Sequence, residues 1–260
     1  MGYETILVEK IGRRATLTLN RPDVMNAMNF AMMKELAHCF EELHNETGVD
    51  VLVIKGAGKV FSAGGDIKMM VNSNDPDDFK NIMDYISRIV RAYYTLPMIT
   101  ITEIHGAAAG LGFSLALGSD IVVAEQTSKI AMNFIGIGLI PDGGGHFFMK
   151  ERVGTMKAKQ LIWEGRVMSG QEAAELGLVD YHVSVHSASV TVEKLVNKTL
   201  ASPTRAMIES KLILHNARLE ELNGILAGEA AGQTKMRATK DHLEGIQAFV
   251  DKRTPSYSGE

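Results

Sequence analysis

Apolar and polar residues alternate at the start of the chain, and further on the apolar residues recur every three or four positions. Apolar runs at residues 6–8 and 15–19 flank a polar turn, which predicts a hairpin of two strands. The spacing between Phe30 and His44 predicts an amphipathic helix. The two patterns then alternate, with strands expected at 51–54, 98–104, 121–124, 129–132 and 179–185, and helical segments at 79–94, 110–117 and 157–178. Strands alternating with helices predict an α/β core of repeated β-β-α units.

The pattern of apolar residues changes after about residue 187. Strand-like runs stop there, and the apolar spacing predicts helices at residues 190–200, 205–216, 219–233 and 240–251. We therefore expect a core at residues 1–187, which holds the chemistry, and a helical region at residues 188–260, which serves for interaction.

Composition narrows the class of protein. Apolar residues make up 45% of the chain and charged residues 22%, the ordinary balance of a globular protein with a buried core. The formal net charge of −4 argues against nucleic acid as the main ligand, because phosphate binding usually shows as an excess of Lys and Arg. Cys39 is the only cysteine, so we expect no disulfide, no metal site, and a core position for this thiol. With no apolar run of membrane-spanning length, a cytoplasmic protein is expected, away from the membrane.

Two glycine-rich segments follow predicted strands. The first, residues 61–68, contains adjacent glycines, which allow a ligand to approach a backbone N–H closely, although a plain strand-to-helix loop would look the same. The second, residues 105–117, opens a helix of small residues, and the unpaired first N–H groups of a helix can bind an anion or a developing oxyanion. The spacing of Gly110 and Gly112 does not fit the dinucleotide-binding pattern.

An aspartate on a tight turn is the third feature. Asp142 stands between a proline and three glycines, after an apolar run. It suits an ordinary turn or helix N-cap residue, which Asp favours. It also suits a general base whose pKa is raised by apolar surroundings, for which Phe134, Ile135 and Leu139 are the expected neighbours. Residues 241–253, the fourth segment, predict by themselves only a charged amphipathic helix.

Taken together, the order and spacing of these segments resemble the enoyl-CoA hydratase/isomerase (crotonase) family along nearly the whole chain, from residue 19 to residue 259. Asn20-Arg-Pro22, Asn26-Ala27 and residues 244–253 match at family spacing as well. The resemblance implies a spiral of β-β-α repeats followed by a helical region that builds homotrimers or dimers of trimers. It also implies an acyl-CoA thioester as ligand, with coenzyme A as part of the substrate and no covalently bound cofactor.

Roles at individual positions follow from the resemblance. The family's oxyanion hole falls on the backbone N–H groups of Gly65 and Leu111, the latter a glycine in most relatives. The remaining expected contacts are with the substrate and its CoA moiety. They are Ala63, Asp66, Ile67 and Lys68 along the CoA arm, Met25 and Ala27 at the adenine end, Phe249 and Lys252 reaching CoA from a neighbouring subunit, and Gly110, Ser114 and Phe134 as further substrate- or CoA-binding residues.

Departures from the family pattern bear on the reaction. The two glutamates of family hydratases are replaced here by Ser114 and Phe134. Asp142 instead resembles the acidic turn residue of the Δ3-Δ2-enoyl-CoA isomerases and of the epoxyphenylacetyl-CoA isomerases of phenylacetate breakdown. We therefore predict an isomerase with one aspartate base, with an enoyl-CoA hydratase and a non-catalytic acyl-CoA- or RNA-binding relative as alternatives. His146 is interpreted as a packing or hydrogen-bonding group, and Trp163 as core or pocket lining.

Overall fold

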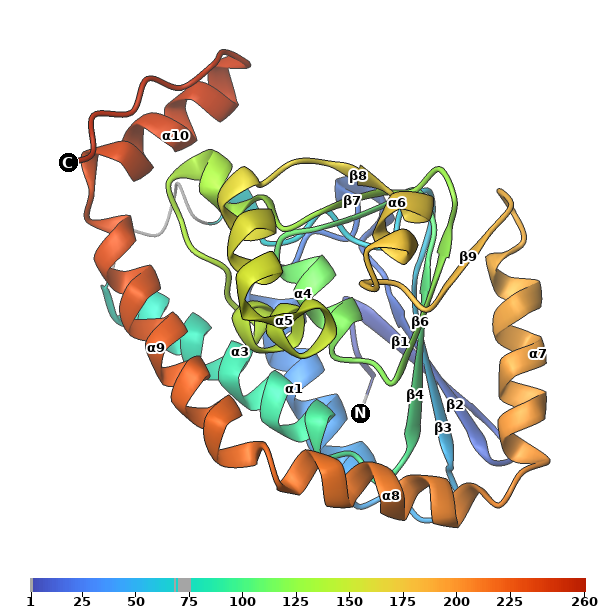
Figure 1. Cartoon of the computed structure of the whole chain (residues 1–260). Coiled ribbons are helices and arrows are strands. Elements are labelled where there is room, and N and C mark those ends of the chain that lie inside the picture. The colour runs from blue at the N-terminus through green and yellow to red at the C-terminus, as the bar shows by residue number, and fades with distance from the viewer. Residues whose placement is uncertain (1, 68, 70–75) are drawn as a thin grey trace.

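A computed structural model describes residues 2–67, 69 and 76–260 of the chain. Its main feature is a six-stranded sheet in the order β1-β2-β3-β4-β6-β9 (Figure 1). The first two strands form the predicted antiparallel hairpin, and all the later pairs in this sheet are parallel. The strands are β1 (Ile6–Ile11), β2 (Arg14–Leu19), β3 (Val51–Gly56), β4 (Ile99–Ile104), β6 (Ile121–Glu125) and β9 (Tyr181–Val183).

Both faces of this sheet are covered, which explains the nearly continuous apolar runs of its inner strands. Successive side chains point to opposite faces. Val51 and Val53 therefore belong to one apolar cluster with residues of α7 (Ala188–Leu200) and α8 (Thr204–Asn216). Leu52 and Ile54 belong to the larger cluster on the other face, with residues of α1 (Phe30–His44) and α3 (Pro76–Tyr94).

A second, three-stranded sheet leads into the segments that hold several of the predicted site residues. It consists of β5 (Ala107–Ala109), β7 (Lys129–Ala131) and β8 (Met168–Ser169) in the order β5-β7-β8. The helix α4 (Leu111–Leu117) follows β5 directly, and the 3-10 turn η2 (Asn133–Ile137) follows β7 closely. The mixed α/β fold class is confirmed.

The stretch after Asp142 differs from the prediction. Helix α5 (Gly145–Glu164) begins twelve positions before the expected start, and its path is interrupted by Gly154 at φ 75°. Residues 157–178 are mostly helical, as expected, but in two pieces, because β8 separates α5 from the short α6 (Gly170–Glu175). Trp163 is neither core nor pocket lining: it is 65% exposed on the last turn of α5, with the Lys159 ammonium 5.6 Å from its ring centroid.

The helical C-terminal region is present as predicted. It consists of α7, α8, α9 (Leu219–Arg237) and α10 (Lys240–Asp251). In Figure 1 these helices run along the sheet, then beneath it, and then up the far side, where α9 packs against α3. The last helix, α10, docks on η2 by close backbone contact, since a Cβ on Gly245 would lie 2.7 Å from Ile137 Cα. The C-terminal region thus reaches the elements around the second sheet.

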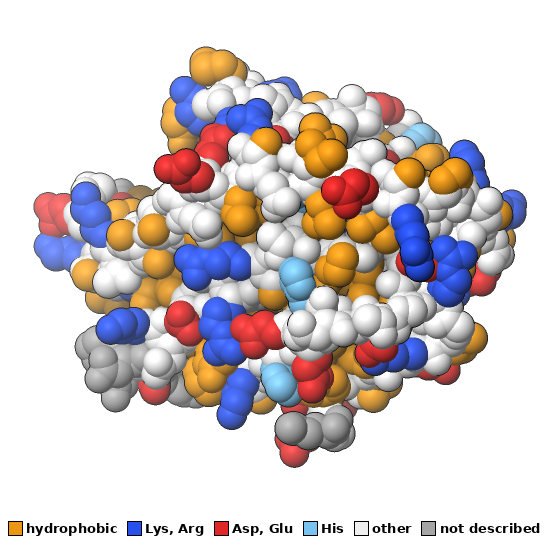
Figure 2. Space-filling view, turned by 90° about the horizontal axis from the view of Figure 1, so that it is seen from below, with side chains coloured by type: hydrophobic (Ala, Val, Ile, Leu, Met, Phe, Trp, Pro, Cys, Tyr) orange, Lys and Arg blue, Asp and Glu red, His pale blue; other side chains and the backbone are white. Residues whose placement is uncertain are grey.

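The surface shows no segregation of charge on the face drawn in Figure 2. Acidic and basic side chains are interspersed there, with small apolar groups between them. Of the helices within the described ranges, none is both long and apolar enough to cross a bilayer.

Candidate active site

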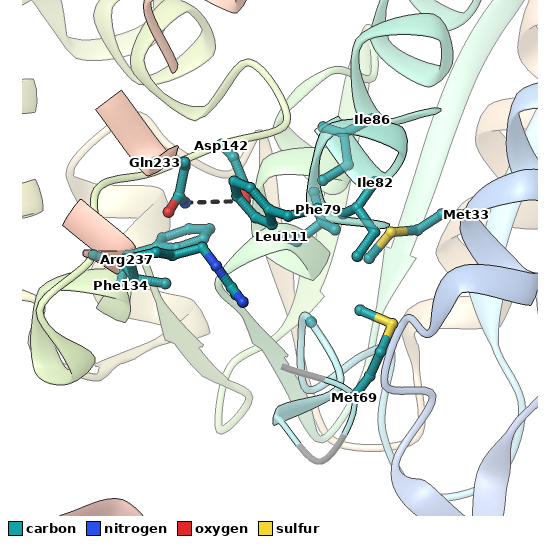
Figure 3. Close-up of a pocket in the computed structure, with 12 residues that line it drawn as sticks. Met33, Met69, Phe79, Ile82, Ile86, Leu111, Phe134, Asp142, Gln233 and Arg237 are labelled. Atoms are coloured by element: carbon teal, nitrogen blue, oxygen red, sulfur yellow. Dashed lines mark hydrogen bonds between the residues drawn. The ribbon is translucent and has the colours of Figure 1, made fainter. Parts of the chain in front are cut away.

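A pocket of about 470 Å³, including the space at its mouth, lies between the second sheet and helices α1, α3 and α9 (Figure 3). Only about 30 Å³ of this space is open to the centre of a water molecule, so the pocket is narrow in this structure. Most of its wall is apolar, and the polar groups converge at one place. The described residues that line it are Met33, Gly65, Met69, Phe79, Ile82, Ile86, Leu111, Phe134, Leu139, Asp142, Gln233 and Arg237.

Gly65 lies on an extended segment that is held from both sides. On one side Met28 N–H donates to Gly64 O at 2.7 Å and Asp66 N–H donates to Met28 O at 3.1 Å. This parallel bridge leaves the N–H of Gly65 itself without an acceptor among the described residues. On the other side Ser62 bridges to Ala108 of β5. The predicted donor is therefore fixed in place and lines the pocket.

Leu111 supplies the second predicted donor as the first residue of α4. Gly110 O accepts the Ser114 N–H at 3.0 Å, which starts the helix, and the Leu111 N–H precedes the first intrahelical bond. The two donor segments approach closely, because a Cβ on Gly64 would stand 3.4 Å from the Leu111 nitrogen. Gly64 has φ 96°, a left-handed conformation that favours glycine. The structure thus brings both predicted N–H groups to one wall.

Four of the predicted CoA contacts lie together beside these donors. Ala63 N–H donates to Met25 O at 2.9 Å, and the Arg21 guanidinium joins Ala27 O to the Asp66 carboxylate, whose Oδ2 lies 3.0 Å away. Met25 is 57% exposed, so this strip faces solvent at the edge of the pocket.

Asn26, a residue whose role the sequence did not reveal, holds this strip. It is fully buried at φ 52°, and its side-chain amide donates to the carbonyls of Ala57, Val60 and Phe61. Its Oδ1 accepts the Arg21 N–H at 2.9 Å. Both ends of its side-chain amide are thereby used to fold the loop that ends in Gly65.

The turn that carries Asp142 requires its glycines. Gly143 and Gly144 have positive φ values of 65° and 75°. A Cβ on Gly143 would lie 2.5 Å from Leu111 Cδ1, and one on Gly145 would lie 2.9 Å from Ser114 Oγ. The turn is therefore pressed against α4, which places Asp142 and the Leu111 donor on adjoining parts of the same pocket.

Asp142 is 5% exposed, and one of its two carboxylate oxygens accepts a hydrogen bond from another side chain. Its Oδ2 accepts from Gln233 Nε2 at 3.1 Å, as the dashed line in Figure 3 shows, while Oδ1 is buried with no partner among the described residues. Burial raises the pKa of Asp142 well above its ordinary value, the charge of Glu229 raises it further, and the Gln233 hydrogen bond acts in the opposite direction. A buried carboxyl with a raised pKa and one oxygen that has no hydrogen-bond partner has the properties of a general base.

Glu229 lies one helical turn before Gln233 on α9. Its side chain is 2% exposed and accepts from Gly144 N–H at 2.8 Å, His146 N–H at 3.1 Å and His146 Nδ1 at 2.9 Å. The first-turn N–H groups of α5 are thus capped by a carboxylate from a helix 83 residues away along the chain. His146 is a hydrogen-bonding group, as interpreted, but its carboxylate partner was not foreseen.

A family model described as enoyl-CoA hydratase/isomerase matches residues 13–260. This chain belongs to that family. The prediction from the motifs is confirmed, and the family implies an acyl-CoA substrate.

Individual members of the enoyl-CoA hydratase/isomerase family are similar over nearly the whole chain. The homologue YhaR of Bacillus subtilis (strain 168) is 48% identical over 246 residues, which cover 95% of this chain and 96% of that one. The 1,2-epoxyphenylacetyl-CoA isomerase of Escherichia coli (strain K12) is 32% identical, with coverages of 94% and 95%. The crystal structure of an enoyl-CoA hydratase from Mycobacterium avium subsp. paratuberculosis K-10 has a TM-score of 0.90 at 30% identity, covering 99% of this chain and 100% of its own.

Other family positions named from the sequence lie elsewhere. Ser114 is fully buried behind the turn, where its hydroxyl donates to Met132 Sδ at 3.7 Å, and it is not among the described pocket-lining residues. The expectation that Ile135 desolvates Asp142 is wrong, since Ile135 is 39% exposed and packs toward Gly165. Phe134 and Leu139 do line the pocket.

The remaining predicted contacts lie around the pocket rather than in its described lining. Gly110 is buried beside Phe134, whose ring atom Cζ would lie 3.7 Å from a Cβ on Gly110. Phe249 is exposed on α10 and the exposed Lys252 directly follows that helix, and their predicted role toward a neighbouring subunit stays a prediction. Ile67 is half-buried, and Lys68 lies outside the described residues.

Two polar pocket residues, Gln233 and Arg237, were not predicted from the sequence. They come from α9, in the region assigned to interaction, and Glu229 precedes them at the same spacing of four. Burial lowers the pKa of Arg237, whose guanidinium lies 4.4 Å from the centroid of the Phe79 ring. Three polar residues at intervals of four lie on one face of a helix, which is the signal that could have indicated them. Within the described ranges no group of His, Cys, Asp and Glu could hold a metal ion.

Proposed function

We propose that this enzyme is an enoyl-CoA isomerase that moves a double bond from C3 to C2, into conjugation with the thioester. The observation that carries the proposal is the buried Oδ1 of Asp142, which has no hydrogen-bond partner among the described residues, in an apolar pocket that Gly65 and Leu111 also line.

The chemistry needs one base and one oxyanion site. The thioester oxygen accepts hydrogen bonds from the Gly65 and Leu111 N–H groups, and Asp142 Oδ1 removes a proton from C2. The resulting dienolate carries its negative charge largely on the oxygen, where the two donors stabilise it. Asp142 then returns the proton to C4 from the same face, so the double bond lies between C2 and C3 and the carboxylate is regenerated.

Hydration needs more than this. A water molecule must lose a proton while C2 gains one, and family hydratases use two acidic residues for the purpose. Asp142 is the single carboxylate among the described pocket-lining residues. The names of relatives do not decide the matter, because an isomerase at 32% identity and a probable enoyl-CoA hydratase at 31% are about equally similar. The preference therefore rests on the site.

The same proposal assigns the solvent-facing strip beside Gly65 to the CoA moiety. Met25, Ala27, Ala63 and Asp66 run from the protein surface to the first donor, so the pantetheine arm enters along them and the acyl group lies in the apolar pocket.

Turnover of matched substrates tests the proposed reaction. We expect the purified protein to convert 3-enoyl-CoA thioesters to 2-enoyl-CoA faster than it hydrates 2-enoyl-CoA, with both reactions followed by ultraviolet absorbance of the conjugated thioester. Faster hydration would assign the hydratase reaction instead. Binding of CoA thioesters without turnover of either series would make the protein a non-catalytic relative.

We also propose that the protein assembles as a homotrimer or a dimer of trimers through its C-terminal helices. The helix α10 lies at the periphery in Figure 1, and Leu243, Phe249 and Val250 on it are 66%, 57% and 58% exposed. Apolar side chains gathered on one exposed helix are typical of an interface. Light scattering is expected to give three or six times the chain mass. A monomer with full affinity for CoA thioesters would contradict the proposal.

A further inference from the structure

Helix α9 presents three polar residues to the interior, one turn apart. Glu229 and Gln233 are 2% and 1% exposed, and Arg237 lines the pocket one turn further on. Figure 3 shows Gln233 pointing at Asp142 and the Arg237 guanidinium directed along the pocket. Burying the Glu229 and Gln233 side chains on one helix face is costly unless they are held by partners.

Gln233 restrains both the turn and the carboxylate on it. Its Nε2 donates to Ile140 O at 2.6 Å and to Asp142 Oδ2 at 3.1 Å, which uses both of its amide hydrogens. A side chain fixed at two points holds the Asp142 carboxylate by one oxygen. The other oxygen, Oδ1, is then the one left to the substrate.

Glu229 brings a negative charge close to that carboxylate. Three donors from α5 converge on it, which is the arrangement a buried anion requires. The charge of Glu229 disfavours ionisation of Asp142 and so raises the pKa of that carboxyl.

We propose that α9 is the positioning element of the base: Gln233 holds Asp142 by Oδ2 so that Oδ1 is left for the substrate, and Glu229, one turn earlier on the helix, anchors the start of α5 directly after the Asp142 turn. Glu229 and Gln233 are positioning residues, because they act through Asp142. The inference rests on the proposed function in taking Asp142 as the base.

Few other charged groups face Asp142. His146 on α5 is bound to Glu229, and Arg237 on α9 lines the same pocket. The described pocket residues from α1, α3 and α4 are Met33, Phe79, Ile82, Ile86 and Leu111, which are all apolar. Of the charged groups, Glu229 is the one whose charge raises the pKa of Asp142.

Two substitutions on one helix are expected to move the pH profile in opposite directions. Asp142 must be ionised to accept the C2 proton, so kcat/KM rises as pH passes its pKa in the free enzyme. Glu229→Gln removes the charge that raises this pKa, and the acidic limb should move to lower pH. Gln233→Leu removes the hydrogen bond that lowers it, and the limb should move to higher pH. Gln233→Leu should also reduce kcat by about 10- to 100-fold, with little change in KM, because the base is no longer held in place.

Controls distinguish a positioning role of α9 from an effect on packing. They also distinguish failure of this proposal from failure of the proposed function. Glu220→Gln removes an exposed charge from the same helix and should leave the profile unchanged. The ionisation of Asp142 is also read without substrate, as the infrared carboxyl signal that disappears in Asp142→Asn, and its midpoint should shift in the same directions.

If Glu229→Gln does not fold, the shift of the Gln233→Leu variant decides. Loss of activity with unmoved midpoints, or midpoints that move the same way in both variants, would overturn the positioning role. Full activity of Asp142→Asn would instead overturn the proposed function.

Discussion

Changing Asp142 to asparagine is expected to slow isomerisation of 3-enoyl-CoA by roughly 10²- to 10⁴-fold, the usual contribution of a general base. Asparagine keeps the shape of the side chain, and its amide oxygen can still accept the Gln233 hydrogen bond that holds Asp142 at 3.1 Å. It cannot take a proton from C2 at neutral pH. The rate is measured as the appearance of the conjugated thioester.

Binding provides the control for this variant. Because the substitution leaves the proposed CoA-binding residues Met25, Ala27, Ala63 and Asp66 unchanged, calorimetry should give nearly the wild-type affinity for a saturated acyl-CoA. Asp84→Asn removes an exposed carboxylate on α3 and should have the wild-type rate. An Asp142→Asn enzyme that isomerises as fast as wild type would remove Asp142 from the mechanism.

Removing one oxyanion donor is the second large effect that we expect. Leu111→Pro deletes an N–H at the first position of α4, a position where proline is well tolerated in helices. Loss of one such donor typically lowers kcat by roughly 10²- to 10³-fold. Gly65→Pro deletes the other donor and should have an effect of the same size.

Leu111→Ala is the matched control, because it removes the same side chain and keeps the N–H. The difference in kcat between the proline and alanine variants then measures the donor alone, provided that circular dichroism shows both to be folded. A folded Leu111→Pro enzyme with the kcat of Leu111→Ala would show that this N–H does not bind the enolate oxygen.

Local patterns were enough to predict most of the strands and the loops of the site. The period of two in β1 and β2, and the buried runs of β3 and β4, identify strands because a covered sheet imposes them. The adjacent glycines at residues 64 and 65 indicated a close backbone approach, and the contact of Gly64 with the Leu111 nitrogen is of that kind. These features depend on neighbours in the chain or on backbone geometry at one residue.

What the sequence did not predict depends on contacts between distant segments. Gln233 meets Asp142 across 91 residues, and Glu229 caps α5 across 83. Neither pairing leaves a local pattern beyond polar residues at a spacing of four on α9. The short β8 was missed for a similar reason, since Met168 and Ser169 form a strand only by pairing with β7. Asn26 looks like an ordinary turn residue until the three carbonyls it binds are known.

The contact between Leu111 and the Gly143 turn bears on how far along the acyl chain the enzyme can act. Since no room for a Cβ exists between them, α4 and the turn are closely packed, and in the proposed mechanism the Leu111 donor and the Asp142 base would keep their relative positions. In the proposed mechanism the base acts at C2 and C4, and we expect it not to follow the chain to carbons further from the thioester. On a polyunsaturated thioester the proposed isomerase would therefore shift the double bond at C3 by one position and leave any double bond beyond C4 where it was.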